Sequence, residues 1–484
     1  MPRTMVIFGA SGDLTSRKLI PALYIQFQRG KLPEATRVVG VSRSEFTDEE
    51  WRQQLAESTR KFVKNAFEEE SWNKFAASIY YVPGDINNED DFTKLAQRLS
   101  EIEQNKPSDR IYYIATMPQL YEAAAAQLGK AGLADDSQGA RRIVVEKPFG
   151  SDLATAQTLN KAITRVFRED QVYRIDHYLG KETVQNLMVF RFGNAIFEPL
   201  WNRHYVDHVQ ITVAEEVAVG RRAGFYDSAG IMRDMFQNHI FQLMMITAME
   251  APVKFNADSV RDEKVKVLSA VRPMRGADFA ERGVRGQYEG YCQEEGVAPG
   301  SQTETFAALK LNIDNWRWKG VPFYLRSGKS LSCRTTQIVL NFREPPHLLF
   351  DNGKQATPQA NRLVIQIQPA EGIQIHFQSK VPDQGMKVRQ SSLDFRFDTG
   401  EDRSQTDAYQ RLLLDALQGD ASLFARSDEV ELAWQIIDPI LAAWRSPAAP
   451  AMHTYPVGGW GPDASAEWIA QDDRTWFDVC PVLH

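Results

Sequence analysis

The sequence predicts an α/β chain of two domains, a doubly wound parallel sheet followed by a larger domain with a broad, mainly antiparallel sheet. Its 484 residues exceed what one compact core usually holds. The first third alternates short β-branched runs with amphipathic helical patterns, which is typical of βαβ units. The later part carries successive strand-like runs without helices between them. We therefore expect domains at 1–177 and 178–484.

The periodicities place the elements of both domains. In the first domain we expect strands at 5–9, 37–41, 79–82, 110–115, 142–145 and 172–175. Helices are expected between them at 14–29, 48–67, 89–103, 119–131 and 152–167. The second domain should contain a long apolar helix at 231–250, strands at 306–313, 337–342, 363–368 and 373–378, and closing helices at 406–417 and 428–444. The Pro- and Gly-rich stretch 446–462 is expected to be a surface loop.

Charge and cysteine content exclude several classes of protein. The formal net charge of -7 gives no positive field for nucleic acid or anionic lipid, so an anionic substrate needs a local basic site. Cys292, Cys333 and Cys480 lack Cys-x-x-Cys spacing, which argues against a disulfide framework and against structural zinc. There is no signal peptide and no apolar run of about 20 residues, so we expect a cytoplasmic protein.

The first expected strand ends in a glycine-containing turn that leads into a helix. Five residues of this turn are candidate cofactor contacts: Gly9, Ser11, Gly12, Asp13 and Leu14. Glycines let the backbone approach a pyrophosphate, and a helix N-terminus favours its negative charge. The spacing is G-x-x-G, so a plain strand-to-helix turn stays an alternative. 

The end of the second strand bears on cofactor choice. Arg43 stands there, where an NAD site usually has a carboxylate for the ribose and an NADP site has an arginine for the 2'-phosphate. This favours NADP without excluding NAD, and a solvated loop arginine is the alternative. Asp85 and Ile86, after the third strand, are weaker candidates for the adenosine end.

Three further segments carry candidate chemistry. Lys147 follows the fifth strand at the ligand-binding edge of the sheet, although strand-ending lysines are also common. The stretch 174–182 (RIDHYLGKE) gathers polar side chains at a strand end and the start of a helix, which suits a phosphate group or a charged helix cap. His239 projects from the apolar side of the long helix, as a core histidine or as a general base with an ordinary pKa of about 6.5.

Together the segments 9–14, 146–150, 174–182 and 233–239 closely resemble the glucose-6-phosphate dehydrogenase family over nearly the whole chain. The resemblance implies oxidation of glucose 6-phosphate by NADP to 6-phosphogluconolactone, the first step of the oxidative pentose phosphate pathway. It implies no metal, a Rossmann domain, and an α+β domain whose sheet mediates assembly into a homodimer or homotetramer. A second, structural NADP is not expected, because Thr335, Thr336 and Val339 follow Arg334 where some relatives carry basic residues.

The resemblance also implies a role for each matching residue. His239 resembles the general base on the C1 hydroxyl, and Asp176 resembles the carboxylate that orients it. Ligands of the sugar phosphate are implied at His177, Tyr178 and Lys181. Further substrate contacts are implied at Lys147, Glu215, Asp234, Lys329, Arg334, Lys18 and, more weakly, Gln368. Lys147 would also meet the cofactor, as would Tyr121.

Two other functions compete with this interpretation. A sugar oxidoreductase of the glucose-fructose oxidoreductase type would act on an unphosphorylated sugar and would not need the phosphate cluster at 176–181. A non-catalytic relative would be expected to have lost His239, Asp176 or Lys181, and all three are present.

Overall fold

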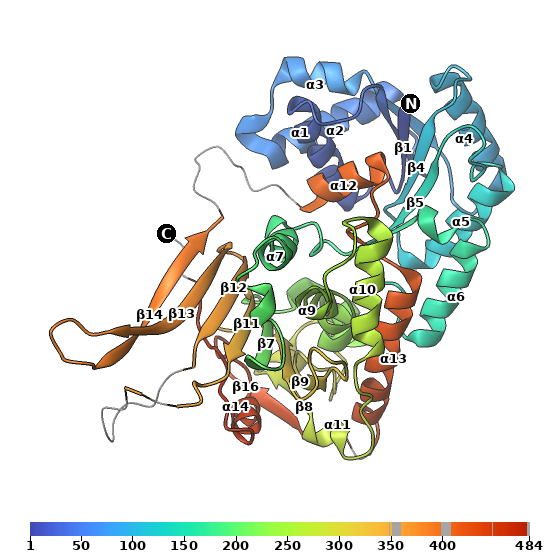
Figure 1. Cartoon of the computed structure of the whole chain (residues 1–484). Coiled ribbons are helices and arrows are strands. Elements are labelled where there is room, and N and C mark those ends of the chain that lie inside the picture. The colour runs from blue at the N-terminus through green and yellow to red at the C-terminus, as the bar shows by residue number, and fades with distance from the viewer. Residues whose placement is uncertain (348, 351–359, 398–407, 448, 482–484) are drawn as a thin grey trace. The chain divides into compact units, whose positions relative to one another are not determined.

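The structure is a computed structural model of the whole chain, and it describes residues 1–347, 349–350, 360–397, 408–447 and 449–481 (Figure 1). The chain forms two compact units. Unit 1 comprises Met1–Lys181, Pro252–Asp262 and Gln405–Glu431. Unit 2 comprises Glu182–Ala251, Glu263–Ser404 and Leu432–His484. Unit 1 therefore takes in two later segments, which the contiguous division at residue 177 does not anticipate.

Unit 1 is built on a seven-stranded sheet in the order β15-β6-β5-β4-β1-β2-β3. Its strands are β1 (Arg3–Phe8), β2 (Thr36–Ser42), β3 (Ile79–Pro83), β4 (Asp109–Ile114), β5 (Arg141–Val145), β6 (Val172–Ile175) and β15 (Phe424–Ala425). All neighbours pair in parallel except β15, which pairs antiparallel with β6. The order reverses between β1 and β4, which confirms the doubly wound sheet and places its ligand-binding crevice beyond these two strands.

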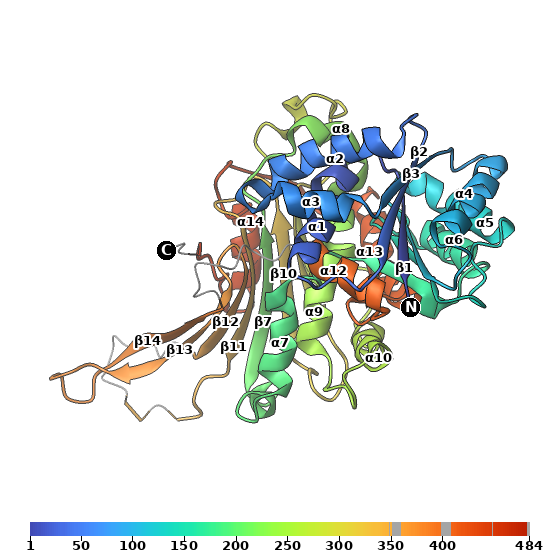
Figure 2. The same ribbon diagram turned by 90° about the horizontal axis from the view of Figure 1, so that it is seen from above.

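The helices of unit 1 follow from capping and apolar periodicity. They are η1 (Thr15–Leu19), α1 (Ile20–Gln28), α2 (Asp48–Val63), α3 (Glu69–Ala76), α4 (Glu89–Ile102), α5 (Tyr121–Lys130), α6 (Leu153–Thr164) and α12 (Ala408–Gln418). Thr47 and Glu50 form a capping box at the start of α2, and Asp152 caps α6 in the same way. Figure 2 shows α1, α2 and α3 on one side of β1, with α4, α5 and α6 on the other. Helix α3 lies beyond the helix expected at 48–67, which ends earlier.

Unit 2 contains a nine-stranded sheet in the order β14-β13-β12-β11-β7-β10-β9-β8-β16. Its strands are β7 (Val206–Ala214), β8 (Gly283–Tyr288), β9 (Phe306–Asn312), β10 (Pro322–Gly328), β11 (Thr335–Phe342), β12 (Arg362–Gln368), β13 (Gly372–Lys380), β14 (Val388–Arg396) and β16 (Met452–Tyr455). Only the pairs β7 with β10 and β8 with β16 are parallel among these described strands. The mainly antiparallel sheet is therefore confirmed.

Strand β16 corrects one expectation, because 446–462 is not a loop throughout. Met452–Tyr455 pairs in parallel with residues 285–288 of β8. Tyr455 is fully buried, and its hydroxyl donates a hydrogen bond to the carbonyl oxygen of Lys329 at 2.8 Å. The sequence did not predict this strand because four residues are too few to show a periodicity and because prolines and glycines flank them.

The helix expected at 231–250 is divided. A π-helical segment, η7 (Met232–Ile240), leads into α9 (Phe241–Ala248). Within unit 2, α7 (Glu182–Phe192) packs against α9 and β12 on one face of the sheet (Figure 2). The remaining helices are α8 (Ala223–Ile231), α10 (Ala257–Ser269), α11 (Asp278–Glu281), α13 (Ser427–Trp444) and α14 (Asp463–Ala470). Short turns of 3-10 helix occur at Lys64–Ala66, Pro118–Leu120, Glu169–Gln171, Glu198–Leu200, Gly220–Arg222 and Tyr291–Gln293.

The cysteines also correct an expectation, because Cys333 and Cys480 form a disulfide across 147 residues of sequence. The residues before Cys480 lie along the sheet of unit 2: the carbonyl of Phe477 accepts a hydrogen bond from Gln337, and Asp478 pairs with Arg326. This path brings the two Cα atoms to 6.0 Å, a normal disulfide separation. Across the described residues, the structure contains no helix with the length and hydropathy of a membrane span.

Candidate active site

The glycine turn after β1 has the geometry of a nucleotide cradle. Gly9 has φ of 85°, and a Cβ there would collide with the carbonyl oxygen of Ala115. The Gly12 amide donates to the Gly9 carbonyl at 2.9 Å, and Asp13 and Leu14 begin the first helical turn. The backbone is thus bare where β1 gives way to a helix start, so the residues present fit a pyrophosphate group.

Arg43 lies beside this cradle. Gly9 donates its amide to the carbonyl of Val41, and the Ser42 hydroxyl donates to that of Ser11 at 3.1 Å, so the end of β2 is fixed against the turn. Arg43 itself is exposed and makes no hydrogen bond or ion pair with any described residue. Its guanidinium is consequently available to an anion.

The two weaker adenosine candidates lie after β3. The carboxylate of Asp85 accepts hydrogen bonds from the backbone and side-chain amides of Asn87 at 2.9 and 3.1 Å. Ile86 is buried. Asp85 thus has a local structural role in its own turn, which is independent of any ligand.

Lys147 follows a residue, Glu146, that takes part in a buried hydrogen-bond network at the end of β5. The preceding Glu146 accepts hydrogen bonds from the hydroxyls of Tyr113 at 2.5 Å and Tyr409 at 3.1 Å. Burial raises the pKa of Glu146, while the two tyrosine hydroxyls and Lys147 oppose the rise. The Lys147–Pro148 bond is cis. Burial also raises the pKa of Tyr121, which stands at the start of α5.

The segment after β6 forms a tight turn that gathers the phosphate candidates. The Asp176 carboxylate accepts a hydrogen bond from the Tyr178 amide at 2.9 Å, and Asp176 is only 2% exposed. The Lys181 ammonium lies 4.0 Å from the centre of the Tyr178 ring, and the His177 ring packs against the same tyrosine. Helix α7 begins only at Glu182, so this group lies in the turn before the helix start.

In unit 2, three predicted substrate contacts form one ionic cluster. The Lys329 ammonium donates to the Asp234 carboxylate at 3.0 Å and also pairs with Glu215. Burial disfavours the charge on Lys329, but the two carboxylates outweigh it and raise its pKa. Lys329 therefore stays protonated and holds both acids in place.

Two more predicted contacts are joined to each other. A guanidinium nitrogen of Arg334 donates to the side-chain oxygen of Gln368 at 3.4 Å, and the Gln368 amide donates to the Thr336 hydroxyl at 3.0 Å. Arg334 is exposed, as is Lys18 on the first helix of unit 1. 

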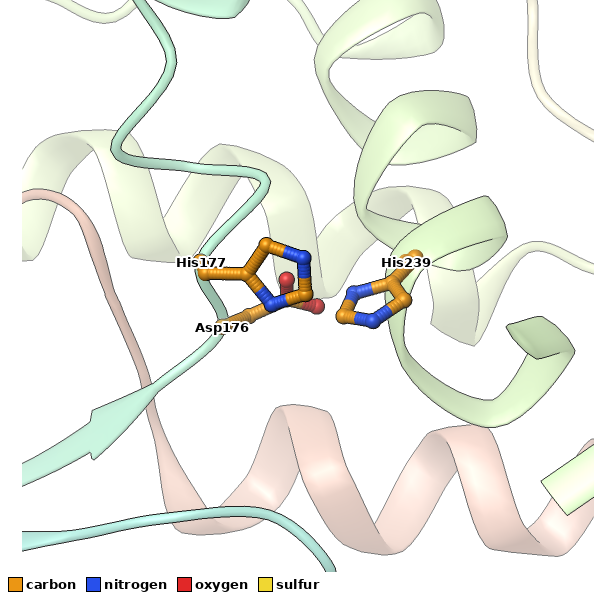
Figure 3. Close-up of side chains that lie close together, drawn as sticks. All are labelled: Asp176, His177 and His239. Atoms are coloured by element: carbon orange, nitrogen blue, oxygen red, sulfur yellow. The ribbon is translucent and has the colours of Figure 1, made fainter. Parts of the chain in front are cut away.

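His239 lies in the π-helical segment η7 and is only 1% exposed. One ring nitrogen of His239, one of His177 and one carboxylate oxygen of Asp176 lie within 4.8 Å of one another (Figure 3). A carboxylate near an imidazole can fix its orientation and stabilise its protonated form. The arrangement suits proton transfer at His239, and it also has the composition of a metal-ligand set.

Some residues that shape the site escaped the sequence analysis. Tyr113 and Tyr409 hold Glu146, and nothing in their sequence context distinguishes them from core tyrosines. Glu304 is buried, and its carboxylate accepts a hydrogen bond from the amide of Met232 at the start of η7. Burial raises the pKa of Glu304. Its sequence neighbours Ser301, Gln302, Thr303 and Thr305 are polar, so nothing in the sequence signals that this acid is buried.

Comparison with known proteins decides the family. The model "Glucose-6-phosphate dehydrogenase, NAD binding domain" matches residues 6–186, and "Glucose-6-phosphate dehydrogenase, C-terminal domain" matches 188–477. The chain belongs to the glucose-6-phosphate dehydrogenase family. Glucose-6-phosphate 1-dehydrogenase of Aggregatibacter actinomycetemcomitans is 45% identical over 98% of this chain and 96% of its own. Glucose-6-phosphate 1-dehydrogenase 2 of Mycobacterium tuberculosis is 44% identical over 98% of this chain and 94% of its own.

Solved structures of the family agree over the full length. A glucose-6-phosphate dehydrogenase in complex with its substrate glucose 6-phosphate superposes with a TM-score of 0.90 at 34% identity, covering 98% of both chains. A glucose-6-phosphate 1-dehydrogenase from Mycobacterium avium gives 0.86 at 33% identity, covering 100% of both chains. This member of the glucose-6-phosphate dehydrogenase family is thus an oxidoreductase that oxidises glucose 6-phosphate and uses a nicotinamide dinucleotide.

Proposed function

We propose that His239 is the general base that removes the proton from the C1 hydroxyl of glucose 6-phosphate. The supporting observation is the buried imidazole with a carboxylate oxygen of Asp176 within 4.8 Å. Asp176 is itself held by the Tyr178 amide, so its carboxylate has a fixed direction. It orients the His239 ring and stabilises the imidazolium that forms as the proton is taken. When bound, the nicotinamide accepts the hydride that leaves C1.

The substrate's phosphate is held by His177, Tyr178 and Lys181. Their support is the tight turn that brings an imidazole, a phenol and an ammonium group together. Glu215 and Asp234 accept hydrogen bonds from sugar hydroxyls, because carboxylates fixed by Lys329 present their remaining lone pairs. Lys147, Lys18, Arg334 and Gln368 are further substrate contacts.

The preferred cofactor is NADP. The turn of Gly9, Ser11, Gly12, Asp13 and Leu14 holds the pyrophosphate, and Arg43 pairs with the 2'-phosphate. The exposed Arg43 guanidinium, without an acidic partner among the described residues, supports this choice. Asp85, Ile86, Tyr121 and Lys147 complete the cofactor site. Replacing Arg43 by alanine should raise the KM for NADP at least tenfold and change the KM for NAD little, whereas equal losses would refute the 2'-phosphate contact.

The chain assembles into a homodimer or homotetramer through the sheet of unit 2. Leu393 and Phe395 on β14 and Met386 just before it are exposed, and β14 is the edge of that sheet. Light scattering during gel filtration measures the mass directly. A monomer across the micromolar range would refute the assembly. A cytoplasmic location accords with the substrate, because a sugar phosphate does not cross a bilayer unaided.

Initial rates with each sugar and each cofactor test the function as a whole. Glucose 6-phosphate with NADP should give the highest kcat/KM, and glucose should give at least a thousandfold less because its contacts to the phosphate turn are missing. A Lys181→Ala variant should reduce that discrimination. Equal activity on glucose and glucose 6-phosphate would favour an oxidoreductase for unphosphorylated sugars.

A further inference from the structure

Unit 1 contains a cavity of about 290 Å³ at the end of its sheet where β5 and β6 begin. Arg141, Arg142, Arg168, Tyr173, Arg261 and Gly419 are among the residues that line it. Arg141 and Arg142 are the first residues of β5, and Tyr173 is near the start of β6. Lys147 and Asp176 follow the opposite ends of these two strands. Since the strands are parallel, the cavity and the cofactor edge are at opposite ends of the sheet.

The cavity carries an excess of positive charge. Four arginines line it against three aspartates, Asp136, Asp170 and Asp258. Arg168 pairs with Asp136 at 2.8 Å and Asp170 at 3.2 Å, and Arg261 pairs with Asp258 at 3.1 Å. All three acids are thereby engaged with two of the arginines.

The other two arginines have no carboxylate partner among the described residues. Arg141 donates to the backbone carbonyls of Ser108, Gly139 and Ala140. Arg142 donates a long hydrogen bond of 3.5 Å to the carbonyl of Leu417 and also interacts with the hydroxyl of Tyr173. Their two charges are therefore not neutralised by the protein residues that line the cavity.

Two of the cavity's buried arginines also have donors with no partner in the part of the chain that the structure describes. Arg261 is 3% exposed, and its Nη1 makes no hydrogen bond there; Arg141 is 4% exposed, and its Nε makes none either. Buried donors are nearly always satisfied in folded proteins, so each such group calls for an explanation. An anion in the cavity would offset the charge of both guanidinium groups without touching these two atoms, which have almost no exposed surface.

Gly419 leaves space for one of these arginines. Its φ is 86°, and a Cβ there would lie 2.6 Å from Nη2 of Arg142. A larger residue would displace the guanidinium from the cavity wall. The backbone after α12 is thus shaped around the Arg142 side chain.

We propose that this cavity binds a phosphate group, as inorganic phosphate or as a small phosphate ester, at a site separate from that of glucose 6-phosphate. Guanidinium groups form bidentate hydrogen bonds with phosphate oxygens, and two of the four here lack an acidic partner. A volume of about 290 Å³ has room for a phosphate group and for a small ester substituent. The bound group would contact the starts of β5 and β6, whose other ends precede Lys147 and Asp176.

Isothermal titration calorimetry of the full chain tests the site. Inorganic phosphate and glycerol 3-phosphate are titrated separately, with glucose 6-phosphate saturating so that its own phosphate site is filled. Arg142→Met removes the cavity's least engaged guanidinium, and Arg165→Met is the matched control because Arg165 is an exposed arginine outside the cavity. We expect Arg142→Met to weaken binding at least tenfold and Arg165→Met to leave it within twofold of wild type.

The outcomes separate the sources of the phosphate group. If both probes bind with equal affinity, the site recognises the phosphate group alone, as in inorganic phosphate. If glycerol 3-phosphate binds at least tenfold more tightly, the site recognises a phosphate ester. Arg142→Lys keeps the charge without the planar fork, so we expect an intermediate affinity, and this variant decides the matter if Arg142→Met does not fold. Wild-type affinity in the Arg142 variants, or no saturable binding to the wild type, would overturn the proposal.

Discussion

The hydroxyl of Tyr409 donates a hydrogen bond to a carboxylate oxygen of Glu146 at 3.1 Å, although 263 residues separate the two in sequence. Tyr409 belongs to α12, in the C-terminal segment that joins unit 1, and Glu146 immediately precedes Lys147. A second tyrosine, Tyr113 on β4, donates to the same oxygen. The end of β5 that carries Lys147 is therefore fixed by two phenols from distant parts of the chain.

Replacing Tyr409 by phenylalanine removes one of these hydrogen bonds and leaves the ring in place. We expect the free energy of unfolding to fall by about 1 to 2 kcal/mol, because the acceptor is a buried carboxyl group. Urea unfolding measures this. Tyr205→Phe is the control, since Tyr205 is exposed and its hydroxyl makes no hydrogen bond with a described residue, and a loss of the same size there would remove the support for the Glu146 contact.

Glu146 should make stability depend on pH. Its pKa is raised above 4.5, chiefly by burial, so the folded protein holds a proton that the unfolded chain has lost over the interval above pH 4.5. The free energy of unfolding of the wild type, relative to Glu146→Gln, should therefore fall as the pH rises through this interval. Urea unfolding at steps from about pH 4 to 7 measures the difference, and a difference that grew with pH would contradict the raised pKa.

Lys329 holds two acids, so its removal should be costly. In Lys329→Met, Glu215 and Asp234 lose the ammonium that they share, and we expect a loss of about 3 kcal/mol in stability, the low end for a buried pair because both acids are partly exposed. The KM for glucose 6-phosphate should rise at least tenfold. Lys319→Met is the control, because its pair with Asp314 is largely exposed and should be worth at most about 1 kcal/mol. Similar losses of stability in both variants would contradict the claim that the ion pairs of Lys329 contribute more than an exposed pair.

The proximity of Asp176, His177 and His239 also permits a metal-based mechanism, and chelation separates the two cases. We expect dialysis against EDTA to leave kcat unchanged, because imidazole and carboxylate suffice for the proton transfer proposed here. Added Zn²⁺ should inhibit by occupying the His239 nitrogen. Loss of activity with EDTA, restored by a divalent ion, would replace the general-base mechanism by a metal-dependent one.

Much of the fold follows from local sequence. Thr47 and Asp152 are residues typical of helix starts. The β-branched runs predict the bounds of the parallel strands β1 to β6 to within a residue or two. Pairing between segments that are far apart in the chain could not be predicted from the local sequence. β15 is two residues long and β16 is four, and each exists only because a distant strand offers a free edge. The Cys333–Cys480 bond depends in the same way on the path of the C-terminal segment.

The same distinction between local and non-local sequence information applies to the candidate site. Compact motifs such as the Gly9 turn and the 176–181 segment identify their own residues, because neighbours in sequence form the geometry. Lys329, Glu215 and Asp234 lie 19 to 114 positions apart, and only the resemblance to a family grouped them in advance. The π-helical form of η7 has no sequence signal that distinguishes it from an α-helix.

The kcat of His239→Asn tests the proposed proton transfer most directly. Asparagine retains a polar side chain of similar size but cannot accept the C1 hydroxyl proton at neutral pH. We expect kcat to fall at least about 100-fold, while the Kd for glucose 6-phosphate from calorimetry stays within threefold of wild type. A variant that kept kcat within tenfold of the wild type would contradict His239 as the base.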